Sequence, residues 1–104
     1  MASPTTGALS GGDSAVLTAD STSGTWTTFT AAYVCSDPAD PEANAWLAGS
    51  VDGVSFFPLR PYDSFPPSEG GAGVRFYKNQ PVTAVQAFVR CSAGNTVTVT
   101  VTGE

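Results

Sequence analysis

The groups in this 104-residue chain best suited to chemistry are its carboxylates and its two cysteines, because the chain contains no histidine. Without histidine, the commonest general base, the commonest zinc ligand and the Ser-His and Cys-His nucleophile pairs are all absent. Asp63 and Glu69 share one loop, and paired carboxylates are what glycosidases use. Such chemistry needs a deep cleft, which a chain this small rarely forms. We therefore expect no enzymatic activity.

A second acidic group, Asp37, Asp40 and Glu42, carries oxygen ligands of the kind that calcium takes. The spacing does not follow an EF-hand, and the two prolines within the segment explain it as a rigid loop. Asp52 precedes Gly53, and this pair is typical of a tight turn. We expect these carboxylates to shape loops and to bind neither a metal nor a cofactor.

Cys35 and Cys91 stand at the ends of two long strand candidates. If they met across the core, a disulfide would add about 4 kcal/mol in the chain-entropy model. The alternative is a pair of buried thiols that pack as small hydrophobic side chains. A cytoplasmic location would favour the thiols. In either case we expect both side chains to be buried and to bind no metal.

The elements that position these groups are predicted to be strands. Only 12% of the residues are charged, and eleven glycines and eight prolines punctuate a chain rich in Thr, Ser and Val. No segment shows helical periodicity, which predicts an all-β fold, an antiparallel β-sandwich of about seven strands. A small closed barrel is the alternative. The expected strands are 14–19, 25–35, 44–51, 54–59, 73–78, 82–91 and 95–102.

The order of the strands in the sandwich stays open between an immunoglobulin-like and a jelly-roll-like arrangement. Trp46 follows Cys35 at a spacing that resembles immunoglobulin domains, but Val89 stands where those domains carry a tyrosine. In the last segment, 95–102, valine alternates strictly with threonine. That alternation predicts an antiparallel strand with one buried and one solvent-facing side.

The clearest local signal is Asp52-Gly53, flanked by two apolar runs. It predicts a two-residue type I′ hairpin with positive φ at both turn residues. In that register Ala48 faces Phe57. Trp46, which belongs to the hairpin, is assigned to the core.

Residues 1–13 are predicted to form an extended N-terminal arm, and residues 14–104 the sandwich domain. The arm consists mainly of Ser, Thr and Gly, with Leu9 as its one large aliphatic side chain. We expect it to be mobile in the isolated protein, so that its deletion leaves the sandwich folded. Leu9 of the arm is a candidate interface residue, as are Tyr62 and Phe65 of a proline-rich loop outside any strand.

Four basic residues against nine acidic ones leave a net charge of −5, which argues against nucleic-acid binding. No apolar run approaches about 20 residues, so we expect no membrane span. The first residues lack the basic start and apolar stretch of a secretory signal. We expect either a virion part made inside a bacterium or a chain from which a signal has been removed.

The stretch 45–59, AWLAGSVDGVSFFPL, together with segment 82–91 and the Thr/Val tail, is similar to a pattern in small structural proteins of tailed bacteriophages. The likeness covers about half the chain. It implies a β-sandwich virion protein of the capsid decoration (minor capsid) type, located on the capsid surface after assembly in the host cytoplasm. Its partners would be the major capsid protein and neighbouring copies of itself, and the resemblance implies no catalytic residues.

A rival hypothesis from another class is a carbohydrate-binding or adhesin-like module of a tail, a fibre or a secreted protein. Its sugar-stacking surface would consist of Trp26, Tyr62 and Tyr77.

Overall fold

The computed structural model of the protein describes residues 4–20, 24–59 and 72–103, and its regular elements are all strands. These described residues contain no helix long and apolar enough to cross a membrane. The strands are β1 (Leu9–Ser10), β2 (Ser14–Thr18), β3 (Phe29–Cys35), β4 (Asn44–Ser50), β5 (Phe57–Pro58), β6 (Ala72–Tyr77), β7 (Ala84–Arg90) and β8 (Thr96–Gly103).

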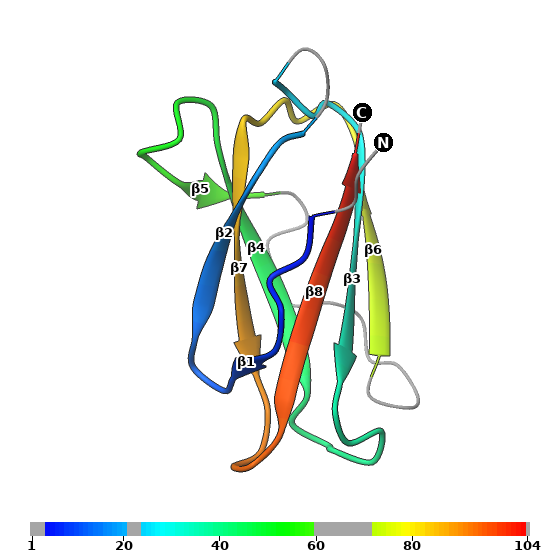
Figure 1. Ribbon diagram of the computed structural model, residues 1–104. Helices are drawn as coiled ribbons and strands as arrows, with labels where there is room; N and C mark the ends of the chain where they lie inside the picture. Colours follow the sequence, from blue (N-terminus) through cyan, green and yellow to red (C-terminus); the bar gives the residue numbers. More distant parts are fainter. Residues whose placement is uncertain (1–3, 21–23, 60–71, 104) are drawn as a thin grey trace.

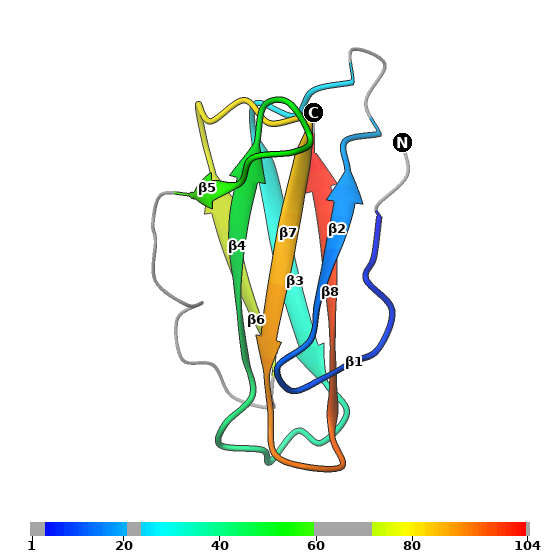
Figure 2. The same cartoon turned by 90° about the vertical axis from the view of Figure 1, so that its left-hand side faces the viewer.

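The strands form two antiparallel sheets of four, in the orders β1-β8-β3-β6 and β2-β7-β4-β5. Figure 1 shows the two sheets edge-on, and Figure 2 shows the second sheet in front of the first. The predicted all-β antiparallel sandwich is confirmed. The closed barrel is wrong, because the two sheets are separate layers with the core between them.

The strand pairs are nested: β1 pairs with β8, β2 with β7, β3 with β6, and β4 with β5. The chain therefore runs as one long hairpin wrapped around a core, which is the arrangement of an eight-stranded jelly roll. In an immunoglobulin domain the last two strands are neighbours in one sheet. Here β8 pairs with β3, and β7 lies in the other sheet. The immunoglobulin-like alternative is wrong.

Residues that alternate along each strand meet in the core between the sheets, because successive side chains of a strand point to opposite faces. The prediction for the last strand is confirmed, since the valines of β8 are fully buried while its threonines line the outer face. The largest fully buried side chains of the core are Trp26, Phe29, Tyr77, Val85, Val89, Val97, Val99 and Val101.

The seven expected segments each contain a strand, but the strands within 25–35 and 54–59 are much shorter than predicted. The long strand expected from residue 25 begins only at Phe29. Trp26 lies before it and makes a separate two-hydrogen-bond bridge to Val82, with N···O distances of 2.8 Å. The bridge holds the indole over one end of the core, where it contacts Phe29 at a ring-centroid distance of 6.1 Å.

The predicted type I′ hairpin is wrong. Gly53 has a positive φ of 80°, but Asp52 does not share it, and Gly49 rather than Ala48 pairs with Phe57. Six residues, 51–56, join β4 to β5 instead of two. The Asp52 carboxylate accepts hydrogen bonds from the backbone N–H of Val54 at 2.8 Å and of Ser55 at 2.9 Å. These side-chain bonds replace the ladder bonds of a tight turn.

The N-terminal arm is extended, and residues 4–10 lie along the edge of β8 (Figure 1). Thr6 N–H donates to Val99 O at 2.9 Å, and Val101 N–H donates to Pro4 O at 2.9 Å. Leu9 is half-buried and packs against the core. The arm thus completes one edge of the first sheet, and it is joined to residues 14–103 by a backbone ladder that the composition of the arm did not indicate.

Candidate binding surfaces

Asp40 accepts more hydrogen bonds than any other acidic side chain of the described residues. Its Oδ2 accepts hydrogen bonds from Ser92 N–H and Asn95 Nδ2, each at 2.8 Å. Its Oδ1 accepts from Glu42 N–H and Ser92 Oγ, also at 2.8 Å. These bonds, with the Asn95 amide as the largest cause, hold the pKa of Asp40 well below its ordinary value.

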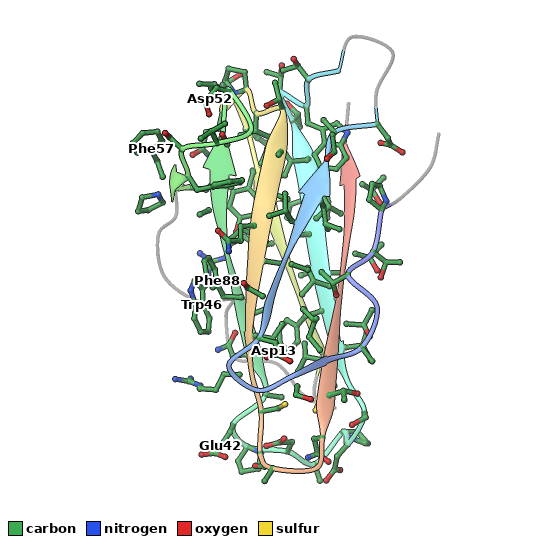
Figure 3. The ribbon with its side chains drawn as sticks, turned by 60° about the vertical axis from the view of Figure 1, so that its left-hand side comes forward. Asp13, Glu42, Trp46, Asp52, Phe57 and Phe88 are labelled. Atoms are coloured by element: carbon green, nitrogen blue, oxygen red, sulfur yellow. The ribbon has the colours of Figure 1, made fainter. Side chains whose placement is uncertain are left out.

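The carboxylate of Asp40 therefore joins the 36–43 loop to the turn after β7, at the end of the sandwich where Glu42 is labelled in Figure 3. The residues that the structure describes contain no group of three or more His, Cys, Asp or Glu side chains arranged to hold a metal. Asp40 serves as a structural tie between two loops.

Both cysteines are free thiols in the structure. Cys35 is buried at the end of β3, and its Sγ lies 3.8 Å from Asp40 Oδ2. Cys91, which was also expected to be buried, is only half-buried, because it lies after the end of β7. Its Sγ donates to Asn95 O at 3.3 Å. Burial, followed by the neighbouring Cys35, raises the pKa of the Cys91 thiol. This environment disfavours the reactive thiolate form.

The sugar-stacking set expected from the sequence is not formed. Trp26 and Tyr77 are core residues with 0% and 1% of their surface exposed. Tyr77 stacks on Phe29 with ring centroids 5.0 Å apart, so its ring is occupied by the core. Tyr62, the third member, lies outside the described residues.

Trp46, which was assigned to the core, lies on the outer face of the second sheet and is half-exposed. It is directly opposite Phe88 in the β4·β7 ladder. The two ring planes are 9° from parallel, and their centroids are 5.7 Å apart. Figure 3 shows both rings side by side, pointing away from the first sheet. We call Trp46 and Phe88 the aromatic pair.

The outer face of the first sheet carries a second feature, a surface without charge. Thr30, Ala32 and Val34 of β3 point outward beside Phe76, Val74 and Ala72 of β6 in a continuous register. Val34, Val74 and Phe76 are 57%, 46% and 65% exposed. The outward threonines of β8 extend this surface on the other side of β3. We call these outward side chains of β3, β6 and β8 the uncharged face.

The three interface candidates from the sequence do not coincide with these two surfaces. Leu9 is half-buried and packs against the core beside β8, away from both surfaces. Tyr62 and Phe65, like Asp63 and Glu69 of the same loop, lie outside the described residues. The outward residues of β3, β4, β6 and β7 were missed because apolar side chains occupy both faces of these strands. Alternation alone does not tell which face is inside.

No protein-family model and no curated protein matches this sequence. A function for the aromatic pair or the uncharged face therefore has to be argued from the geometry of this chain.

Proposed function

We propose that this protein is a structural protein of a tailed-bacteriophage virion, a capsid decoration (minor capsid) protein that binds the outer surface of the shell. The observation that carries the proposal is the uncharged face. The bacteriophage-like pattern of the sequence supplies the identity of the partner, and jelly rolls are common among viral capsid proteins.

The uncharged face has the composition of a protein interface rather than of a solvent-facing sheet. Charged residues are depleted at the centres of interfaces, while aromatic residues are enriched there. The described outward positions of β3, β6 and β8 carry no charged side chain, and Phe76 lies among them with 65% of its surface exposed. Contiguous exposed apolar patches of this kind mark interaction sites.

The proposed mechanism is a clamp. The sandwich is a rigid body, and its uncharged face would lie across neighbouring major capsid subunits or against a neighbouring copy of this protein. The junction between neighbouring capsid subunits exists only on the assembled shell. Binding across that junction would therefore stabilise the shell by mass action. The proposal places the protein on the virion surface and gives it no enzymatic activity.

The proposal is tested by co-sedimentation with shells that lack the protein. Phe76→Ser is expected to reduce the bound fraction at least tenfold, because it removes the largest exposed apolar side chain of the face. Phe57→Ser is the matched control, since Phe57 is 61% exposed but lies on β5 of the other sheet. Equal binding of the Phe76 variant, the control and the unmodified protein would remove the uncharged face from the mechanism.

A carbohydrate-binding module of a tail, a fibre or a secreted protein is the second candidate function. The specific observation in its favour is the aromatic pair, which replaces the set Trp26, Tyr62 and Tyr77. The two candidates use opposite faces of the sandwich, so variants of one face leave the other intact.

A further inference from the structure

The aromatic pair is the middle rung of a short ladder on the outer face of β4 and β7. Asn44 lies opposite Arg90, Trp46 opposite Phe88, and Ala48 opposite Gln86. Successive rungs on one face are two residues apart, which is roughly 6.8 Å along a strand. The three rungs therefore form a stripe roughly 14 Å long, with aromatic rings in its centre and polar side chains at both ends.

A neutral amide lies at each end of the stripe, and at one end the charged Arg90 lies opposite it. Gln86 donates from Nε2 to Ser14 Oγ at 3.1 Å, a bond that orients the amide across β2 and β7. A primary amide carries two N–H donors and an acceptor oxygen, so this one bond leaves Gln86 capacity for a ligand. At the other end, Asn44 Oδ1 accepts from Ala45 N–H at 2.7 Å, which orients the second amide.

The charges near the stripe and on the whole protein indicate which class of ligand the stripe suits. Arg90 is the one charged residue among the outward positions of β2, β4 and β7. The whole chain carries a net charge of −5, which repels polyanions at long range. A partly exposed, stacked aromatic pair bordered by amides, on an acidic protein, suits a neutral ligand that presents both an apolar face and hydrogen-bonding groups.

We infer that the outer face of β4 and β7 binds a neutral polysaccharide. The apolar C–H face of a pyranose ring would lie against the exposed part of the stacked Trp46 and Phe88 rings, and its hydroxyls would bond to the amide of Gln86. Sites of this kind combine an aromatic surface with a few placed polar groups that fix orientation. The inference rests on the second candidate function, whose ligand class it names, and it does not depend on the proposed attachment to a shell, which uses the opposite face.

Affinity electrophoresis of the full chain in gels containing soluble polysaccharides tests the inference. The neutral probes are hydroxyethylcellulose, galactomannan and dextran, and alginate is the acidic probe. We expect at least one neutral probe to retard the protein and alginate not to do so. Trp46→Ala is expected to weaken that retardation at least tenfold, whereas the matched control Phe57→Ala, also an exposed aromatic on this sheet, is expected to leave it unchanged.

A second variant separates loss of binding from loss of folding. Gln86→Ala removes one amide from the stripe but leaves the aromatic pair and the core, and we expect several-fold weaker retardation with an unchanged circular dichroism spectrum. The inference is overturned if no neutral probe retards the protein. It is also overturned if Trp46→Ala and Gln86→Ala, both folded, migrate as the unmodified protein does.

Discussion

At the scale of single residues, Asp40 shows how one side chain closes an end of the sandwich. It accepts four hydrogen bonds at 2.8 Å from three residues of two loops. Asparagine in its place would present an N–H₂ group toward donors, so one set of bonds would become repulsive. The role of Asp40 is therefore tied to its ionised form.

We predict a pH dependence of stability for this residue. Its pKa in the folded protein is lowered from the ordinary value of 3.8, so its contribution is fully present above pH 3.8 and is lost as the pH falls below it. Urea unfolding of the unmodified protein and of Asp40→Asn, from pH 7 to pH 2, measures this. The variant should be less stable at pH 7, and the difference should shrink in acid.

The control for this experiment is Asp37→Asn. Asp37 is exposed, and its carboxylate accepts one local bond from Ala39 N–H at 2.9 Å. The Asp37→Asn substitution should change the unfolding midpoint little at any pH. A difference between Asp40→Asn and the unmodified protein that stays constant from pH 7 to pH 2 would contradict the assigned role.

A second prediction at this scale concerns the thiols. Cys35 is shielded from reagents by burial, and the raised pKa of Cys91 disfavours its thiolate in the folded protein. Alkylation by iodoacetamide at pH 8, followed by mass spectrometry, should be slow for the native protein and fast in urea. Cys91, which is half-buried, should react before Cys35. Rapid labelling of both thiols without urea would show that this end of the sandwich is open.

At the scale of elements, the fit between β8 and the segment before β3 depends on a glycine. A Cβ atom added at Gly103 would lie 2.5 Å from Cγ of the Trp26 ring. The indole is fully buried, and the backbone of Trp26 is held by its bridge to Val82.

We therefore predict that Gly103→Ala destabilises the protein by about 1–3 kcal/mol through overpacking. This outweighs the roughly 0.5–1 kcal/mol that replacing a strand glycine gains. Denaturant unfolding measures the change. Thr100→Ala is the control, because it alters an outward position of the same strand. An unchanged midpoint for Gly103→Ala would mean that Trp26 is not seated against β8.

At the scale of the whole molecule, the N-terminal arm pairs with β8, the last strand, and so brings the two ends of the chain together. Residues 4–10 cover the edge of β8, which would otherwise expose unpaired backbone groups. Removing residues 2–12 deletes the bonds Thr6 N–H to Val99 O and Val101 N–H to Pro4 O, together with the packing of Leu9.

We predict that this deletion lowers stability by roughly 2 kcal/mol or more, at about 1 kcal/mol net for each hydrogen bond lost. Thermal unfolding of the full and truncated chains measures it. Co-sedimentation with shells then separates two roles of the arm, because the uncharged face is retained in the truncated chain. An unchanged melting temperature would show that the arm does not hold β8 in solution.

The amino-acid sequence by itself determined the all-β class and the location of most strands. The alternation of valine and threonine in 96–102 assigned each side chain to the correct face, because the period of a strand is two and only one face was apolar. Pro38, Pro41 and the Asp52-Gly53 pair lie in loops as predicted, because proline and Asp-Gly favour turns through their own backbone preferences. Gly53 does require positive φ, although the turn around it is longer than predicted.

Only the tertiary structure decided which strands meet and which aromatic rings are inside. Strands β1 and β8 lie at opposite ends of the sequence, and they pair through backbone groups that every residue carries, so no residue type marks the contact. In β4 and β7 apolar side chains occupy both faces, so the alternation of residue types did not show which face is buried. Trp26 was free to reach the core by its bridge to Val82, whereas Trp46 had to follow the pleat outward because its neighbours Ala45 and Leu47 point inward.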